Sequence, residues 1–324
     1  MPDKIIERIL AAADTPDLLD ILTNRLSLSD LQSLLLEVYR QRAASLTPSD
    51  ILKQYENNRF VVPSQVDPQQ QLEFDRLAYS VLPPGFEALE LSPVSPLGTN
   101  SVVATVNQNK VLSTIRNTEV TADVTNVLAL ECAKRRRASA PHTRTHEMIK
   151  LCASHRVLRT QQVNGPNLFQ HFRLLGLCTA GRDTGSYRFE IDALIEHLEF
   201  YFRLFEAANH SGFAMATPNP GIADVRVSLT AFDKIRYNAL QASVLEKLAT
   251  QYPQVTFAFD RERETGRGYY DSAGFHIYGC DSSGTEYFLV DGGFTDWTQQ
   301  LLNNKKERLL ISGIGSERFV LCFK

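Results

Sequence analysis

The sequence predicts an α+β fold, in which a mixed, mainly antiparallel sheet is flanked by helices and preceded by a small helical region. Beyond residue 86, short β-rich runs alternate with helical segments. Tight turns such as Asn164-Gly165-Pro166 and Ser283-Gly284 join neighbouring runs, and turns of this kind form hairpins. Hairpins favour an antiparallel sheet over a doubly wound parallel one.

Residues 1–66 are predicted to form a separate helical region. Thr15-Pro16, Thr47-Pro48 and Asp67-Pro68 each place a capping oxygen before a proline that suits the first helical turn, and Ser29 with Gln32 indicates a capping box. Apolar residues recur there at helical spacing, namely Ile5, Ile6, Ile9, Leu10, Leu31, Leu34, Leu35 and Val38. These stripes are expected to pack against the protein's own core; binding of another protein is the alternative.

Residues 67–324 are expected to form the core domain. A helix over 68–82 is ended by Pro83-Pro84-Gly85, and an extended stretch follows over 86–94. Strands are expected at 110–115, 157–160, 168–177, 225–229, 255–259, 275–278, 286–290 and 309–314.

The composition indicates a soluble, cytoplasmic protein. Of the 324 residues, 43% are hydrophobic and 22% charged. No apolar run approaches the roughly 20 residues of a membrane span, and the N-terminus lacks a signal-peptide pattern. Five scattered cysteines without a CxxC pair are expected to be reduced thiols. A net charge of −3 argues against broad nonspecific binding to nucleic acid.

Two smaller patterns have ordinary interpretations. His142 and His146 lie four residues apart, but no third ligand motif accompanies them, so no metal site is expected. A basic cluster is interpreted as a solvated helix end, with an RNA or phosphate contact as the alternative. Its members are Lys134, Arg135, Arg136, Arg137 and Arg144.

The C-terminal segment carries the strongest chemical signal. An apolar strand over 309–314 runs into Gly313 and Gly315, and Glu317 and Arg318 then open a helix. Glycines let a ligand approach the backbone, and an arginine fixed beside them presents a guanidinium fork that suits a triphosphate.

This segment resembles motif 3 of the class II aminoacyl-tRNA synthetases, in which a strand and a glycine pair precede a phosphate-binding arginine, here Arg318. Upstream, the stretch from Arg267 to Gly274 resembles the RGLDYYTG signature of histidyl-tRNA synthetases. The stretch from Asp291 to Trp297 resembles the glycine-rich GGGRYD strand of the same family. The three matches occur in the family's order.

Two further motifs of that family can be placed by resemblance. Arg159 and the strand through Phe172 look like motif 2, whose arginine holds the α-phosphate and whose phenylalanine stacks on adenine. Gln161 stands where the family has a glutamate that pairs with the adenine amino group. The segment 119–122 resembles the family's EGTA sequence, in which the glutamate, here Glu119, accepts the α-amino group of the substrate.

The resemblance spans residues 68–324 and implies an adenylate-forming site for ATP, Mg²⁺ and a small amino or carboxylic acid. Arg159, Arg267 and Arg318 would stabilise phosphate charge. Nucleotide binding is carried over to Arg159, Gln161, Phe172, Glu317 and Arg318, and substrate binding to Glu119, Thr121, Leu174, Cys178, Tyr269, Gly292 and Gly293. The helix over 68–82 and the strand after it resemble motif 1, which implies a homodimer.

Departures from the family pattern shape the functional hypotheses. Leu174 and Cys178 stand where histidyl enzymes bind the imidazole, so a smaller or more apolar substrate is expected. The chain ends six residues after Arg318, so anticodon recognition of a tRNA is not expected. The first hypothesis is an adenylate-forming ligase that uses another kind of acceptor. The alternatives are a regulatory subunit resembling that of ATP phosphoribosyltransferase and an interaction module with a vestigial pocket.

Overall fold

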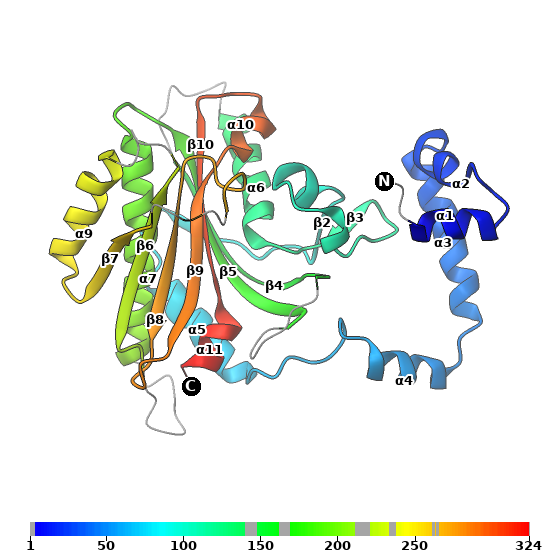
Figure 1. The fold of residues 1–324 in the computed structure, drawn as a ribbon, viewed down its shortest axis with the longest axis horizontal. Helices are drawn as coiled ribbons and strands as arrows, with labels where there is room; N and C mark the ends of the chain where they lie inside the picture. Colours follow the sequence, from blue (N-terminus) through cyan, green and yellow to red (C-terminus); the bar gives the residue numbers. More distant parts are fainter. Residues whose placement is uncertain are drawn as a thin grey trace.

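The computed structural model describes residues 4–139, 148–161, 169–210, 221–232, 238–260, 263 and 266–323. A large sheet carries helices on both faces, and an N-terminal helical arm projects from one side (Figure 1). The predicted α+β class is confirmed, with a mainly antiparallel sheet.

An eight-stranded sheet forms the centre of the core, in the order β1-β4-β5-β10-β9-β8-β6-β7. Its strands are β1 (Phe86–Ala88), β4 (Ile149–Leu158), β5 (His171–Arg182), β6 (Asp224–Ala231), β7 (Val255–Phe259), β8 (Ala273–Cys280), β9 (Glu286–Thr295) and β10 (Glu307–Gly315). The pairs β1–β4 and β6–β7 are parallel, and the central pairs are antiparallel. A separate pair is formed by β2 (Val94–Pro96) and β3 (Thr118–Val120).

Helices cover both faces of this sheet. On the first face lie α5 (Pro68–Ser80), α7 (Arg188–His210), the π-helical turn η4 (Gln241–Leu245), α9 (Glu246–Gln251) and α11 (Ser316–Cys322), around the larger apolar core. On the second face lie α6 (Val124–Ser139) and α10 (Trp297–Leu302), together with the π-helical turn η2 (Thr99–Val103) and the 3-10 turn η3 (Gln108–Lys110) near them. Both faces are therefore packed, and this is why the central strands read as nearly continuous apolar runs.

Alternation along β10 fixes which residues face which helices. Leu310 and Ile314 pack into the first core, whereas Leu309 and Ile311 pack into the second. Successive side chains of a strand point to opposite faces, so Gly313 and Gly315 lie on the second face. The glycine pair identified in the sequence thus belongs to the side of the sheet that carries α6 and α10.

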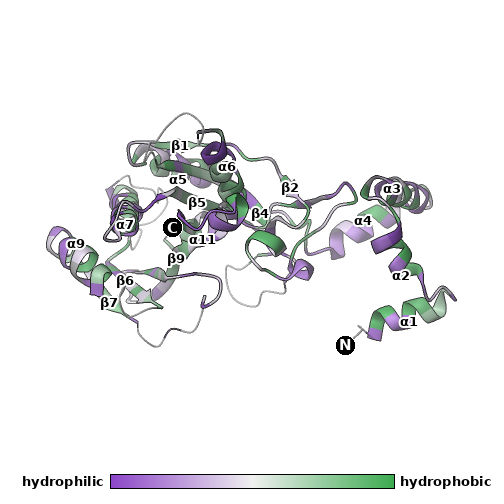
Figure 2. Cartoon of the chain, turned by 90° about the horizontal axis from the view of Figure 1, so that it is seen from above, coloured by the Kyte–Doolittle hydropathy of each residue, from purple (hydrophilic) through white to green (hydrophobic). Residues whose placement is uncertain are grey.

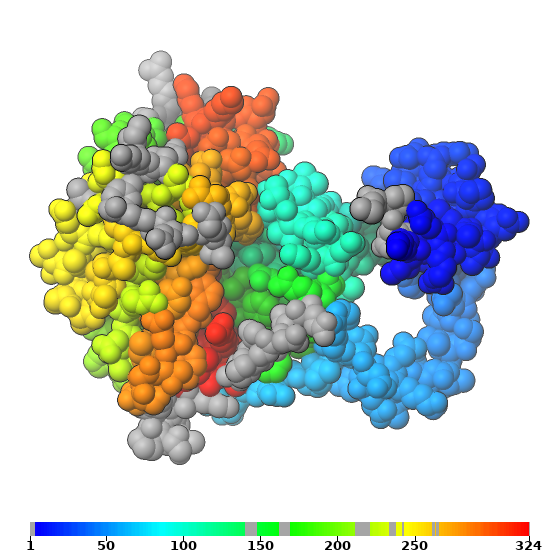
Figure 3. All heavy atoms as spheres, in the orientation of Figure 1, coloured from blue at the N-terminus to red at the C-terminus, as the bar shows by residue number. Residues whose placement is uncertain are grey.

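The N-terminal arm keeps its apolar side chains exposed. It consists of α1 (Lys4–Ala12), α2 (Leu18–Asp20), η1 (Ile21–Arg25), α3 (Leu28–Ala44) and α4 (Pro48–Asn57). No described side chain before Val66 is buried. Figures 2 and 3 show the arm standing apart from the core, joined by a thin connection. Gln32 of α3 accepts a hydrogen bond from the Asn117 side chain of the core at 3.5 Å. The expectation that the apolar stripes pack against the protein's own core is therefore wrong.

Helix caps in the arm differ in part from the prediction. Thr47 accepts a hydrogen bond from the Asp50 amide, and the Asp50 carboxylate accepts one from the Thr47 amide, so the predicted start of α4 is confirmed. Asp67 caps α5 as predicted. For α3, Ser27 rather than Ser29 is the cap, because Ser27 has the extended backbone of a cap while Ser29 lies inside the helix. Nothing caps α2 in this way at Thr15, which lies three residues before its start.

The expected strand at 110–115 is absent from the structure. η3 ends at Lys110, and only an isolated bridge between Ser113 and Glu119 follows. In contrast, β4 and β5 are longer than the runs expected at 157–160 and 168–177. The turn Asn164-Gly165-Pro166 and the residues His142, Arg144 and His146 lie outside the described residues.

The basic cluster at the end of α6 is paired rather than solvated. Arg136 Nε lies 2.9 Å from the Glu307 carboxylate, and the two side chains are 8% and 1% exposed. Arg135 contacts Glu87 and Glu131. These ion pairs hold α6 against the start of β10 and against β1, so the interpretation as a solvated helix end is wrong for these two residues.

Within the described residues, no helix is long and apolar enough to cross a membrane.

A buried histidine links α7 to two central strands. His197 contacts Thr179 of β5 through Nε2 at 3.0 Å and Ser312 of β10 through Nδ1 at 2.8 Å. Burial lowers the pKa of His197 from 6.5 to about 3. As the pH falls below 6.5, an unfolded chain binds a proton there that the folded chain rejects, so stability present above pH 6.5 is lost on acidification.

We expect this histidine to contribute about 2 kcal/mol of acid destabilisation between pH 6.5 and pH 4.5, because each pKa unit is worth about 1.4 kcal/mol. The measurement is the free energy of unfolding in urea at both pH values for the wild type and for His197→Gln. The variant should lose less stability over this range, by about that amount. Parallel pH profiles for the two proteins would contradict the assignment.

Candidate functional site

The second face of the sheet has an open strip where β5, β10 and β9 lie side by side. Gly315 pairs with Leu174, and Gly313 pairs with Asp291. Phe172 lies two residues before Leu174 and therefore on the same face. We call these five residues, Phe172, Leu174, Asp291, Gly313 and Gly315, the glycine floor. Its two glycines are partly exposed and have no side chain to obstruct a ligand.

Arg318 lies at one end of the glycine floor. It is in the first turn of α11, directly after β10, and Ser316 of the same turn contacts the Arg173 carbonyl beside Phe172. The Arg318 side chain is partly exposed and makes no hydrogen bond or ion pair with any residue that the structure describes. A cation without a protein partner at this position remains available to an anionic ligand.

Arg159 lies near the same end, just after β4. Its guanidinium donates to the Ala122 carbonyl at 3.0 Å and to Asp123 Oδ2 at 3.1 Å, and its centre lies 5.2 Å from the Phe172 ring centroid. Asp123 also accepts the Thr125 amide at the start of α6. Arg159 is thus oriented by the start of α6 and remains about one-third exposed.

Arg267 is not at this end of the sheet. It precedes β8, whose first residues lie level with Gly293 of β9 and Ile311 of β10, away from Gly315. Its guanidinium lies 5.4 Å from the Phe232 ring, and the residue is exposed. The structure therefore brings Arg159 and Arg318 to one end of the sheet and places Arg267 toward the other.

Glu119 is fully buried and fully engaged. Oε2 accepts from the Gly98 amide and from Gln108 Nε2, and Oε1 accepts from the amide and the side chain of Asn100. Burial alone would raise the pKa of Glu119, but these hydrogen bonds outweigh it and lower the pKa. The carboxylate stabilises η2 and is not available to the amino group of a substrate, in contrast to the role carried over by resemblance.

The residues expected to surround the substrate side chain pack against one another. Cys178, Tyr270, Trp297 and Ile311 belong to one buried apolar cluster, and Tyr269 packs on it with its ring 5.4 Å from that of Trp297. Burial raises the pKa of the Cys178 thiol well above its ordinary value. This part of the second face has little room for a large side chain.

Four other predicted residues have structural partners. Thr121 is buried and donates to the Ser92 carbonyl at 3.2 Å. Gly293 lies beneath Tyr270, whereas Gly292 faces the first core, where a Cβ would meet Phe275. Glu317 is buried in an ion pair with Arg156 of β4. Of the predicted nucleotide contacts, Gln161 is exposed two residues beyond Arg159.

The polar contacts that Asp291 of the glycine floor makes with His276 and Arg263 were not predicted from the sequence. Asp291 Oδ1 lies 3.3 Å from His276 Nε2 and 3.4 Å from Arg263 Nη2. The sequence shows that His276 and Tyr278 share a face of their strand, but only the register of β8 on β9 places that face beside Asp291.

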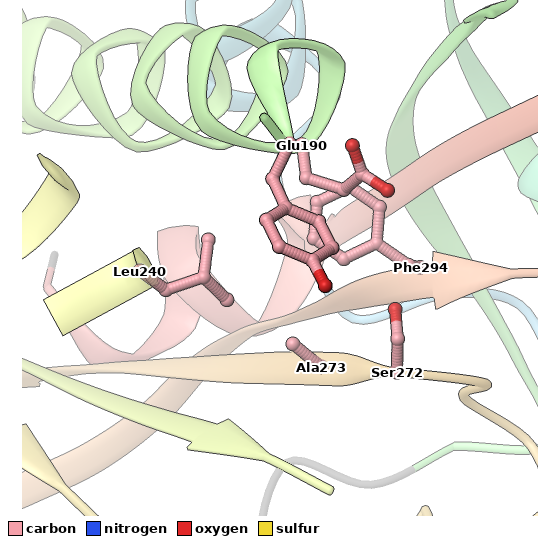
Figure 4. A pocket seen from close by; sticks show the side chains of 6 residues that line it. Glu190, Leu240, Ser272, Ala273 and Phe294 are labelled. Atoms are coloured by element: carbon pink, nitrogen blue, oxygen red, sulfur yellow. The ribbon is translucent and has the colours of Figure 1, made fainter. Parts of the chain in front are cut away.

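A small hollow lies elsewhere, on the first face (Figure 4). It is lined by Tyr187, Glu190, Leu240, Ser272, Ala273 and Phe294. Since Phe294 and Ala273 belong to the first core, this hollow is separate from the glycine floor.

Among the described residues, no group of three or more His, Cys, Asp or Glu side chains could hold a metal ion. Mg²⁺ bound mainly through phosphate oxygens does not require such a group.

Comparison with solved structures identifies this architecture. A Bacillus halodurans protein described as an ATP phosphoribosyltransferase regulatory subunit/histidyl-tRNA synthetase superimposes with a TM-score of 0.55 at 14% identity, covering 82% of each chain. Staphylococcus aureus histidyl-tRNA synthetase gives 0.55 at 13% identity, covering 80% of this chain and 69% of that one. The chain has the fold of a histidyl-type class II synthetase core. A histidine–tRNA ligase subunit from Alicyclobacillus acidocaldarius matches this synthetase-like core with a TM-score of 0.51 at 12% identity, over 80% of this chain and 94% of that one.

No family model and no curated protein sequence matches the chain. The likeness therefore concerns the fold of the synthetase-like core, and its chemistry has to be argued from its own residues.

Proposed function

We propose that the synthetase-like core binds ATP together with Mg²⁺ on the glycine floor and uses the nucleotide to activate a small acid as an acyl adenylate. The observation that carries this proposal is Arg318, a guanidinium without a described protein partner beside a side-chain-free stretch of β10. Phe172 at the same end offers an aromatic face for the adenine ring, and Arg159 a second cation.

The reaction places specific demands on these residues. A substrate carboxylate oxygen attacks the α-phosphorus of ATP, the new bond forms in line with the bond that breaks, and pyrophosphate leaves. Negative charge gathers on the phosphate oxygens during this step, and fixed cations stabilise it. Arg159 and Arg318 supply positive charge, and Mg²⁺ bound with the nucleotide would neutralise further phosphate charge. No covalent nucleophile from the protein is required.

The packing around Cys178 and Trp297 indicates the size of the acid. Both side chains are buried, and Tyr270 covers Gly293 beside them, so a side chain as large as histidine has little space there. We therefore propose a substrate with a small or apolar side chain. A homodimer through α5 and β2 fits the exposed apolar residues Leu72 and Val94 on these elements.

The test of this function is exchange of labelled pyrophosphate into ATP, measured with each of the twenty amino acids and with small carboxylic acids. We expect exchange with one or a few small acids and none with histidine. Arg318→Ala should lower the rate by at least about tenfold, because a charge-assisted hydrogen bond to phosphate is worth about 1.5–3 kcal/mol. Arg76→Ala, which removes an exposed arginine of α5, is the matched control. A folded protein that binds ATP without any exchange would point instead to a nucleotide-binding regulatory module.

A further inference from the structure

Polar contacts hold the segment between the N-terminal arm and the core against the ends of β4 and β5. This segment, residues 58–67, lies between α4 and α5, and we call it the arm connection (Figure 1). Arg59 Nη2 donates to the Thr160 carbonyl at 2.8 Å. His171 Nε2 lies 2.6 Å from the Val62 carbonyl oxygen. The arm connection is therefore bound at two points to the strands that lead into the proposed nucleotide site.

Both points of attachment are next to residues of that site. Thr160 directly follows Arg159, and His171 directly precedes Phe172. Because successive side chains of a strand point to opposite faces, His171 lies on the first face, behind the glycine floor. The arm connection thus contacts the neighbours of two proposed nucleotide contacts without entering the site itself.

His171 begins a chain of contacts that ends beside Arg318. Its Nδ1 lies 3.0 Å from Arg156 Nη1, and Arg156 Nη2 forms an ion pair with Glu317, whose side chain is 1% exposed. Glu317 directly precedes Arg318 in the first turn of α11. Arg318 makes no hydrogen bond or ion pair with any residue that the structure describes. The position of its guanidinium therefore depends on how this turn of α11 is held.

The two partners of His171 define which ring nitrogen carries the proton. The Val62 carbonyl oxygen only accepts hydrogen bonds, so Nε2 donates to it. An arginine only donates, so Nδ1 accepts from Arg156. The imidazole therefore joins an acceptor on the arm connection to a donor on β4. A hydrocarbon side chain can do neither, whereas the amide of glutamine has both a donor and an acceptor.

We propose that His171 is a positioning residue for Arg318, which it connects through Arg156 and Glu317 to the arm connection, so that the placement of the arm sets the affinity for nucleotide. This inference rests on the proposed nucleotide function and specifies how that site is controlled. Without His171, the Arg156 guanidinium loses one of the two contacts that direct it toward Glu317. A binding group held by such supporting contacts loses its productive geometry when they are removed.

The test measures the dissociation constant of ATP with Mg²⁺ by isothermal titration calorimetry, using the full chain. His171→Leu should weaken binding by about fivefold, since residues joined in one network commonly couple by about this factor. His171→Gln should bind ATP within about twofold of the wild type, because it keeps a donor and an acceptor. Arg59→Ala releases the arm connection from Thr160 and should weaken binding by about threefold. The matched control is Arg40→Ala, which removes an exposed arginine paired with Glu37 inside α3.

A double-mutant cycle distinguishes positioning from a general structural role. If His171 acts through Arg318, then His171→Leu should change the ATP affinity of Arg318→Ala by less than about twofold. A further loss of about fivefold in that background would show that His171 acts independently of Arg318, and would overturn the inference.

Two other results would also overturn it. If His171→Leu and Arg59→Ala bind ATP as the wild type does, the nucleotide function stands but the arm connection does not control it. If the wild type does not bind ATP, the nucleotide function fails and the inference fails with it. Melting temperatures establish that each comparison concerns folded protein. Arg59→Ala changes an exposed side chain and decides the question if His171→Leu does not fold.

Discussion

Glu307→Gln is expected to lower the free energy of unfolding by about 3–5 kcal/mol, the usual cost of leaving a buried charge without its partner. The Glu307 side chain is 1% exposed and lies 2.9 Å from Arg136 and 2.7 Å from Arg182. Glutamine keeps the shape but removes the charge that neutralises Arg136 beneath α6. Urea unfolding of the wild type and the variant measures the difference.

Glu286→Gln provides the comparison for this prediction. It breaks an ion pair of similar length, 2.8 Å from Arg226, in which both side chains are more than one-third exposed. Such a pair contributes at most about 1 kcal/mol. Equal destabilisation by the two substitutions would contradict the account, because Glu307 is buried with two arginine partners whereas Glu286 is exposed with one.

Gly293→Ala is expected to destabilise the fold by about 1–3 kcal/mol through overpacking. A Cβ at this position would lie 2.5 Å from Tyr270 Cδ1 and 2.8 Å from the Ala273 carbonyl oxygen. Neither neighbour can move easily, since Tyr270 is buried in the apolar core on the second face of the sheet and the carbonyl belongs to β8. A fall in the urea midpoint at unchanged slope would measure the loss.

Gly315→Ala, a substitution on the glycine floor itself, is the control. There a Cβ meets nothing closer than Arg318 Cβ at 3.6 Å, an ordinary contact. The backbone φ of Gly315 is −69°, which alanine adopts readily. We expect unchanged stability for this variant. If both alanines were tolerated equally, Gly293 would not be a packing position and would have to be explained by ligand access instead.

The sequence predicted the central strands well because burial on both faces gives them an unmistakable pattern. In β10, apolar residues run almost without interruption, and the observed strand includes the predicted one. β4 was underestimated because Ser154 and Arg156 interrupt its apolar pattern. In the fold, Ser154 donates to Asp75 of α5 and Arg156 pairs with Glu317 of α11. Such partners become visible only when distant segments meet.

The positions of site residues could be predicted where a local motif fixes the backbone geometry. Whether a side chain is free to bind a ligand could not be predicted, because that depends on burial by distant segments. Arg318 occupies its expected place because a strand, two glycines and a helix start define it locally. Glu119 matches its motif by residue type, but its four hydrogen bonds come from Gly98, Asn100 and Gln108, whose approach cannot be read from the sequence. Asp291 was overlooked for the opposite reason, because only strand register reveals its exposed position on the floor.

The most direct test of the central claim is the dissociation constant of ATP, measured by isothermal titration calorimetry in the presence of Mg²⁺ for the wild type, Phe172→Ala and Arg318→Ala. If the nucleotide lies on the glycine floor, each substitution should weaken binding by about tenfold or more, since stacking and a charge-assisted contact are each worth about 1–3 kcal/mol. Arg76→Ala should bind ATP as the wild type does. ATP affinity that is unchanged in both Phe172→Ala and Arg318→Ala would place the nucleotide elsewhere and contradict the account.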